Sequence, residues 1–375
     1  MNTATSPAHH PRRAARRLLG GAACAIALVT ATVAQAQVGL ARFDVGGLPV
    51  TLVYPTEVRA TRQAFGPYEL EVATGAPLAA GAPRRLIVMS HGSGGSPLPD
   101  HAMAATLARA GFVVAQPLHA GDNHADTSRA GPASWQLRPT EVSRVIDALA
   151  ADPRWAPRLQ LDRVGVHGMS AGGVTALALA GAQWRVLDLA QHCNAHLEQD
   201  LGFCFNGVTD PAKQAERKAA YERARGVPEA YLPAEVTVVH GGRTPPAGAT
   251  GFDPRPDPRI ASVTLAVPLS AIFTAQSLAR IAIPVGVVSA TADTMLLPAY
   301  HSGHVLRECG RCTLLAELQG AAHFDLLSPW PASVADAVAL QMPRGGRTAP
   351  GFDPRLRTEA MARIVDFHRR NLAQD

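Results

Sequence analysis

The most constraining feature of the sequence is a glycine-rich turn that follows an apolar run. The stretch Arg163–Ala182 reads RVGVHGMSAGGVTALALAGA and places Ser170 in a Gly-x-Ser-x-Gly motif, between a predicted strand and a predicted helix of small residues. This pattern is typical of a nucleophile elbow, a strained strand-to-helix turn that exposes the serine hydroxyl. A plain glycine-rich turn has the same local pattern. The rest of the chain must therefore supply an acid, a histidine and an oxyanion hole.

The alternation of apolar runs with helical patterns predicts an α/β fold, a mostly parallel, doubly wound sheet with helices on both faces. An apolar run at 50–54 adds antiparallel strands at one edge. The expected strands lie at 86–90, 112–115, 164–166, 261–269, 285–289 and 313–318, and the expected helices at 103–110, 140–150 and 361–372.

Two further side chains follow predicted strands in the order that α/β-hydrolases use. Asp293 follows the run 285–289, and His323 follows the run 313–318. Ligands of open parallel sheets bind at the carboxyl ends of the strands, so these groups and Ser170 are expected to meet. A serine hydroxyl needs a neutral imidazole to take its proton, and a carboxylate to hold the imidazole in the right tautomer. We predict Ser170 as nucleophile, His323 as base and Asp293 as acid.

Backbone amides are expected to form the oxyanion hole. One belongs to Ala171, the residue after the nucleophile. The other comes from the glycine-rich loop after the first core strand, Ser90–Ser96, which reads SHGSGGS. We predict Ser93 as its donor, with Gly94 as the alternative.

Other titratable groups are expected to be structural. Asp325 is the nearest competitor of Asp293, but it lies two residues from His323 and should face away. His167, just before the elbow, is expected to pack in its strand. Six further histidines show no ligand spacing, so we predict neither a metal nor another cofactor. They are His9, His10, His119, His124, His301 and His304.

The N-terminus has the pattern of a secretory signal peptide over residues 1–36. Four arginines precede an apolar stretch, Leu18–Val33, and Ala34-Gln35-Ala36 is a typical cleavage site. An uncleaved membrane anchor is the rival interpretation, although the run is short and weakly hydrophobic for a span. Without the leader the formal net charge falls from +5 to +1, which offers no basic tract for nucleic acid. The mature protein, residues 37–375, is expected in the periplasm or outside the cell. Its oligomeric state is left open.

Four cysteines remain after the leader. An even count in an exported protein indicates disulfides, and proximity pairs Cys193 with Cys204 and Cys309 with Cys312. The Cys309-Gly-Arg-Cys312 stretch could also be a redox motif or half of a zinc site. No second Cys-x-x-Cys accompanies it, and a strand rather than a helix follows it, which favours a structural bridge.

A long segment from about 184 to 258 interrupts the strand pattern, and we interpret it as a cap inserted into the hydrolase domain. It contains a charged helical stretch, Pro211–Gly226. Its aromatic residues before Phe252 are candidates to line an acyl pocket: Phe203, Phe205, Tyr221 and Tyr231. The sequence Gly-Phe-Asp-Pro-Arg occurs twice, at 251–255 and 351–355.

As a set, these motifs resemble a known family. The segments LIVMSHGSGGSPLPDHAMAATLARAGFVVAQPLHAGDN, RPTEVSRVIDAL and VGVHGMSAGGVTALALAGA are similar to the predicted dienelactone hydrolases, a group next to the plasma-type platelet-activating-factor acetylhydrolases of the α/β-hydrolase superfamily. The resemblance covers roughly 84–182 and 260–330. It implies a metal-independent serine esterase for short-acyl or lactone esters, with Ser170, Asp293 and His323 as triad and Ser93 and Ala171 as oxyanion donors.

The sequence thus favours an exported carboxylic-ester hydrolase that acts on a small ester. A cutinase-like secreted polyesterase is a second hypothesis, which an open cleft would favour and a long cap opposes. A binding protein on a hydrolase scaffold is a third, which the intact triad opposes.

Overall fold

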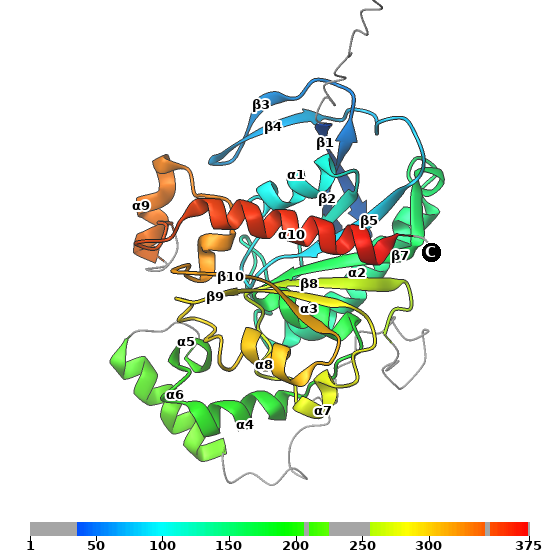
Figure 1. The fold of residues 1–375 in the computed structure, drawn as a ribbon. Coiled ribbons are helices and arrows are strands. Elements are labelled where there is room, and N and C mark those ends of the chain that lie inside the picture. The colour runs from blue at the N-terminus through cyan, green and yellow to red at the C-terminus, as the bar shows by residue number, and fades with distance from the viewer. Residues whose placement is uncertain (1–35, 206–209, 225–255, 342–345, 374–375) are drawn as a thin grey trace, which may run out of the picture. The chain divides into compact units, whose positions relative to one another are not determined.

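The computed structural model describes residues 36–205, 210–224, 256–341 and 346–373, and within these ranges ten strands form one mixed sheet in the order β10-β9-β8-β7-β5-β6-β2-β1-β4-β3 (Figure 1). None of the helices described there is long and apolar enough to cross a bilayer. The strands are β1 Gln37–Val45, β2 Leu48–Thr56, β3 Thr61–Phe65, β4 Tyr68–Thr74, β5 Arg84–Ser90, β6 Val113–Pro117, β7 Leu159–Met169, β8 Ile260–Ala266, β9 Val285–Ala290 and β10 Cys312–Leu318. The helices are α1 His101–Arg109, α2 Pro132–Ala151, α3 Ala171–Leu179, α4 Val186–His196, α5 Leu201–Cys204, α6 Pro211–Ala224, α7 Ala275–Leu278, α8 Ser302–Glu308, α9 Ala332–Gln341 and α10 Pro354–Leu372, with short 3-10 helices at Ala156–Arg158 and His323–Leu326.

The six strands from β5 to β10 pair only in parallel with one another. The central ones are apolar and buried along most of their length because helices cover both faces. Helices α1 and α10 lie together on one face, and α2, α3 and α8 pack on the other. The predicted mostly parallel, doubly wound sheet is confirmed.

The N-terminal strands extend this sheet mostly by antiparallel pairing, although β1 and β4 pair in parallel. Strand β2 pairs antiparallel with both β6 and β1. The β1–β2 hairpin turns at Gly46 and Gly47, whose φ angles are 58° and 86°. Two positive φ angles in a row are what a tight hairpin turn requires, and glycine adopts them without strain. The antiparallel edge predicted from the 50–54 run is confirmed, whereas β1, β3 and β4 had no separate signal.

Helix α2 is longer than its apolar spacing predicts. The expected helix covered 140–150, but α2 begins at Pro132 and contains Pro139 in its interior. A proline inside a helix removes one N–H and normally ends the helix. The apolar spacing therefore predicts a helix only in the part that follows Pro139.

Helix α10 also begins earlier, at Pro354 rather than at Met361, and its start explains the second Gly-Phe-Asp-Pro-Arg segment. The Asp353 carboxylate accepts the backbone N–H of Arg355 at 3.0 Å, and Pro354 occupies the first turn. An aspartate cap followed by proline is a typical helix start. The first copy of the segment lies outside the described residues, as do the leader and Tyr231.

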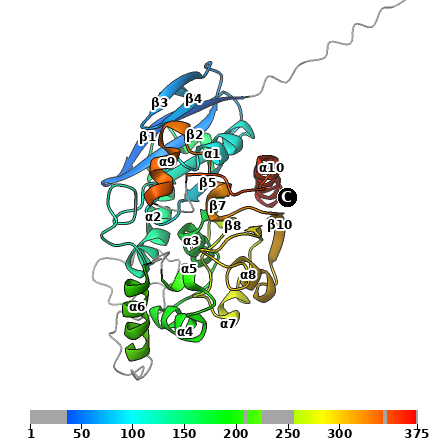
Figure 2. The same ribbon diagram turned by 90° about the vertical axis from the view of Figure 1, so that its left-hand side faces the viewer.

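The segment between α3 and β8, here called the insert (residues 184–258), is helical where it is described. It contains α4, α5 and α6, and Figure 2 shows α4 and α6 side by side. One disulfide joins Cys193 of α4 to Cys204 of α5. The second bridge joins Cys309 to Cys312, between α8 and β10. Both bridges have the predicted pairing, and the role of the insert as a cap stays a prediction.

Candidate active site

Ser170 lies at the turn between β7 and α3, with φ 54° and ψ −119°. Such a conformation costs a residue other than glycine about 1–3 kcal/mol, and it persists only where the surroundings enforce it. Three backbone hydrogen bonds do so here. Ser170 donates its N–H to the carbonyl of Ala266 at 3.1 Å, and its own carbonyl accepts the N–H groups of Gly173 at 2.8 Å and Leu269 at 2.9 Å.

The two glycines of the motif are required by close backbone contacts. A Cβ atom on Gly172 would lie 1.9 Å from the carbonyl oxygen of Ser90, and one on Gly168 would lie 2.2 Å from that of Gly172. Strands β5 and β7 and helix α3 therefore meet at the elbow. This contact also brings the loop after β5 to Ser170, because a Cβ on Gly92 would lie 3.3 Å from Cβ of Ser170.

The structure brings the three predicted triad side chains together. The imidazole of His323 lies between them, with Nε2 at 2.9 Å from Oγ of Ser170 and Nδ1 at 2.7 Å from Oδ2 of Asp293. Asp293 and His323 are each only 2% exposed. The other carboxylate oxygen of Asp293 accepts the N–H groups of Met295 and Leu296, both at 2.9 Å. These bonds fix the carboxylate, so the proton of His323 is on Nδ1 and its Nε2 lone pair faces the serine.

The competing acid does not contact His323. The carboxylate of Asp325 accepts backbone N–H groups of Ala322 at 2.8 Å and of Ala349 at 3.2 Å. His167, as expected, packs in its strand, with Nδ1 at 2.9 Å from the hydroxyl of Thr264. Burial lowers the pKa of His167 to about 4.

The loop after β5 distinguishes the two candidate oxyanion donors. The N–H of Gly94 is occupied, because it donates to Oδ1 of Asp122 at 2.8 Å. Within the described part of the chain, the N–H groups of Ser93 and Ala171 donate to no protein acceptor. Gly94 is thereby removed as the alternative, and Ser93 and Ala171 keep amides that a substrate oxygen could bind.

Comparison with known proteins identifies the fold. No family model and no curated protein matches the sequence. Among solved structures, a ferulic acid esterase from Streptomyces cinnamoneus is similar, with a TM-score of 0.53 and 17% sequence identity over 92% of each chain. The chain has the α/β-hydrolase fold. Ser170, Asp293 and His323 follow β7, β9 and β10, and serine, acid and histidine in that chain order are typical of this fold.

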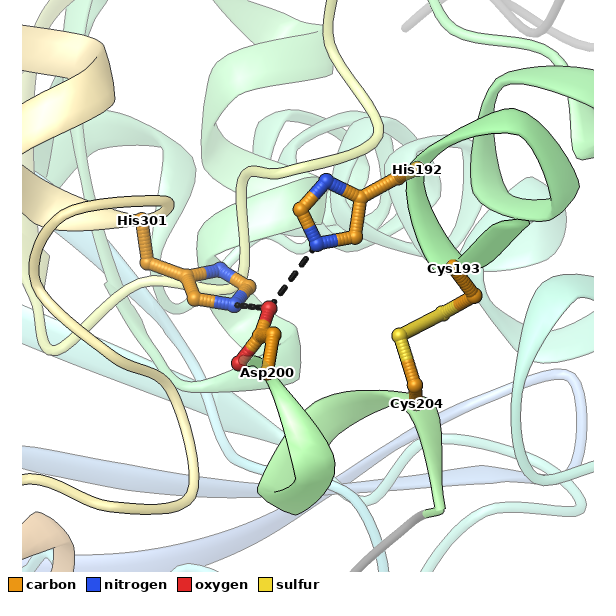
Figure 3. The surroundings of a disulfide bond; sticks show 5 residues. All are labelled: His192, Cys193, Asp200, Cys204 and His301. Atoms are coloured by element: carbon orange, nitrogen blue, oxygen red, sulfur yellow. Dashed lines mark hydrogen bonds and ion pairs between the residues drawn. A yellow bond between two sulfur atoms is a disulfide. The ribbon is translucent and has the colours of Figure 1, made fainter. Parts of the chain in front are cut away.

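Sequence reasoning missed a buried cluster that anchors the insert to the hydrolase core. Figure 3 shows His192 of α4 and His301, which precedes α8, both directed at Asp200. Their Nε2 atoms lie 2.9 and 3.3 Å from Oδ2 of that carboxylate. Burial alone would raise the pKa of Asp200, but hydrogen bonds from both histidines bring it below the usual value. His192 and Asp200 are 8 residues apart, but His301 lies 101 residues after Asp200, so no local sequence pattern marks the cluster.

The cluster is a hydrogen-bonded anchor rather than a metal centre. His301 accepts the backbone N–H of Ser270 at its Nδ1, at 3.1 Å, so its proton is on the Nε2 that faces Asp200. A metal ion would need the lone pair of that nitrogen. Burial lowers the pKa of His301, which keeps the ring neutral. No group of three potential ligands suited to a metal occurs among the residues that the structure describes.

This anchor lies next to two loops of the candidate site. Ser270 follows Leu269, which donates its N–H to the carbonyl of Ser170. The loop after β9 that contains Asp293 is here called the acid loop. Helix α5 packs on it, because a Cβ on Gly202 would lie 2.1 Å from the carbonyl oxygen of Thr294. Phe203 contacts the ring of His301 edge-on at 5.1 Å, and Phe205 is buried beside the disulfide. Of the other aromatic candidates, the side chain of Tyr221 lies outside the described part.

A cavity of about 400 Å³ lies elsewhere, between the N-terminal strands and helices α1 and α10. Aliphatic and polar side chains line it in similar numbers, with Glu69, Glu71 and Arg109 among the charged ones, and neither Ser170 nor His323 is part of its wall. The chemistry of the triad therefore does not take place in this cavity.

Removing the bridge between α4 and α5 should loosen the insert. The double substitution Cys193→Ala/Cys204→Ala opens a loop with a sequence separation of 11 residues, so the free energy of unfolding should fall by about 3 kcal/mol. Thermal unfolding and limited proteolysis measure this loss, and cleavage should increase within the insert.

The matched control is Cys309→Ala/Cys312→Ala, whose separation is only 3 residues. It should cost less stability and leave proteolysis of the insert unchanged. The native mature protein should show no free thiol under denaturing conditions. Four titratable thiols would contradict the disulfide assignment.

Proposed function

We propose that this protein is a serine hydrolase that cleaves carboxylic esters through an acyl-enzyme intermediate. The observation that carries the proposal is the pair of hydrogen bonds that link Ser170 to His323, at 2.9 Å, and His323 to Asp293, at 2.7 Å. An esterase as structural neighbour supports the same class of reaction.

In the proposed mechanism, Oγ of Ser170 attacks the ester carbonyl while Nε2 of His323 takes the hydroxyl proton. The Asp293 carboxylate stabilises the imidazolium that forms. The negative carbonyl oxygen accepts hydrogen bonds from the amides of Ser93 and Ala171. The imidazolium then protonates the leaving alcohol, and the C–O bond breaks to leave the acyl-enzyme.

Deacylation repeats these steps with water. His323 takes a proton from the attacking water, the tetrahedral intermediate forms in the same oxyanion hole, and Ser170 leaves as an alkoxide that recovers the proton. The products are a carboxylic acid and an alcohol. Asp293 keeps its hydrogen bonds to His323 and to the backbone N–H groups of Met295 and Leu296 in both halves of the proposed reaction.

For the substrate, we propose a small ester with a short acyl group or a lactone. The resemblance to the predicted dienelactone hydrolases supports this class. The contact of α5 with the acid loop supports the insert as a cap that limits the acyl chain. A hydroxycinnamoyl ester is the second candidate, because the structural neighbour is a ferulic acid esterase.

We further propose that the mature protein is exported to the periplasm or beyond. Two disulfides support an oxidising compartment, and the pattern of residues 1–36 supports a cleaved leader.

Substitution of the nucleophile tests the proposed reaction. Ser170→Ala should lower kcat for p-nitrophenyl acetate by about 10⁴-fold or more. The melting temperature should not fall, because alanine removes only a hydroxyl at a partly exposed position. A fluorophosphonate should label the wild type at Ser170 alone. Near-normal turnover by Ser170→Ala, or a label on another serine, would contradict the proposal.

A graded ester series tests the substrate class. We expect kcat/KM to be highest for acyl groups of roughly two to six carbons, with at most about 10- to 200-fold discrimination per methylene. The series comprises acetate, butyrate, octanoate, palmitate and ferulate esters, measured for the intact protein and for a variant shortened between α5 and β8. A preference for ferulate would assign the second candidate. A preference for long chains, or an unchanged profile in the shortened variant, would favour the open-cleft polyesterase.

A further inference from the structure

A completely buried ion pair contacts the glycine-rich loop after β5, residues 90–96, here called the oxyanion loop. Nη2 of Arg138 is 2.7 Å from Oδ2 of Asp122, and both side chains are 0% exposed. Replacing a buried ion pair by apolar side chains is often neutral or stabilising, so such a pair is weak evidence for a role in stability. Its hydrogen bonds indicate another role.

Asp122 accepts hydrogen bonds from two adjacent residues of this loop. Its Oδ1 accepts the hydroxyl of Ser93 at 2.7 Å and the N–H of Gly94 at 2.8 Å. Gly94 has φ 65°, a conformation that glycine adopts without strain. One carboxylate oxygen thereby fixes the Ser93 side chain and the orientation of the next peptide group. The N–H of Ser93 donates to no acceptor among the residues that the structure describes.

Arg138 ties the same loop to the segment between β6 and α2. Its Nη1 donates to the carbonyl of His91 at 2.6 Å, and its Nη2 donates to the carbonyl of Asp122 at 3.3 Å. Its Nε donates to the hydroxyl of Ser134 in the same helix at 2.9 Å. The guanidinium also neutralises Asp122. An unpaired carboxylate at this place would repel the negative oxygen that develops during ester cleavage, so the two charges are needed together.

The base of the loop is held by a second serine–histidine–acid set. His119 has Nε2 at 2.8 Å from Oγ of Ser90 and Nδ1 at 2.6 Å from the carboxylate of Glu141. His119 is 0% exposed and Ser90 only 2%, so no substrate reaches them. Burial holds the pKa of His119 well below its usual value. This set is a structural support with a neutral imidazole at its centre, and it leaves Asp122 and Arg138 as the groups that act at the tip of the loop.

We propose that Asp122 and Arg138 are positioning residues that hold the Ser93 amide toward the oxyanion of the transition state. The inference rests on the proposed serine-hydrolase function and adds to it the groups that preorganise the oxyanion hole. Donors that are already oriented stabilise the developing charge without reorganisation, and a displacement of about 1 Å can cost roughly 10²-fold in rate.

Three variants remove, in increasing number, the contacts that hold the Ser93 amide. Ser93→Ala keeps the amide but removes the hydroxyl contact. Asp122→Asn keeps an acceptor oxygen but removes the charge, and Asp122→Ala/Arg138→Met removes the pair while leaving no buried charge unpaired. We expect kcat to fall increasingly along this order, by at least about 10-fold for the last variant, with KM changed less than about twofold.

The Ki of a trifluoromethyl ketone separates a positioning role from a merely structural one, because a structural role would leave this Ki unchanged. This inhibitor forms a tetrahedral oxyanion on the nucleophilic serine, so its Ki should rise in proportion to the loss in kcat/KM. Thermal unfolding identifies the temperature at which each variant remains folded, and all kinetics are measured there.

The chain offers a matched control in a second buried aspartate. Asp257 accepts the hydroxyl of Ser143 at 2.7 Å and pairs with Arg259 at 2.6 Å, with no contact to the oxyanion loop. Asp257→Asn should lower the melting temperature but leave kcat and Ki unchanged.

Unchanged kcat and Ki in all three variants would overturn the positioning role while leaving the esterase proposal intact. The same would follow if Asp257→Asn lost activity to the same extent as Asp122→Asn. A wild type that cleaves no ester and reacts with no fluorophosphonate would overturn the proposed function itself, and the positioning role with it.

Discussion

The backbone conformation of Ser170 is the constraint on which the rest of the site depends. Its φ of 54° is held by hydrogen bonds to the loop after β8 and by a glycine contact with the end of β5. One strained residue therefore brings the ends of β5, β7 and β8 together. The loops after these strands carry the proposed nucleophile, the candidate oxyanion amides and the attachment point of the insert. The small residues around Ser170 are consequences of that convergence.

Around this turn, buried carboxylates are held in hydrogen-bonded networks that differ in charge. The acid loop is held by backbone N–H groups on Asp293, the oxyanion loop by the Asp122–Arg138 pair, and the insert by Asp200 between two histidines. Each carboxylate accepts more than one hydrogen bond, which offsets the desolvation of its charge. These contacts hold the two loops and the insert in place, as the positioning of reacting groups requires.

The sequence predicts those parts of the molecule whose signals are local. Ser170, Asp293 and His323 each follow an apolar strand, and strand ends of a parallel sheet converge whatever the detailed packing. The cysteine pairing could be predicted for the same reason, since the two cysteines of each pair are close in sequence. The start of α2 was hidden by Pro139, and β1, β3 and β4 carry no pattern as strong as the central strands.

The supporting networks were not predictable because their members are brought together only by the fold. Asp200 and His301 lie in different segments, and neither has a neighbour that marks its role. Asp122 and Arg138 come from a loop and from the half of α2 that the apolar spacing missed. The choice between Ser93 and Gly94 also depended on this pair, because only the position of Asp122 shows which amide is occupied.

The most direct test of this account is a crystal structure of the protein inhibited by a methylphosphonate ester. The account predicts phosphorus bonded to Oγ of Ser170 and the phosphonyl oxygen about 3 Å from the amide nitrogens of both Ser93 and Ala171, with Gly94 still bound to Asp122. An adduct on another serine, or a phosphonyl oxygen directed away from both amides, would contradict it.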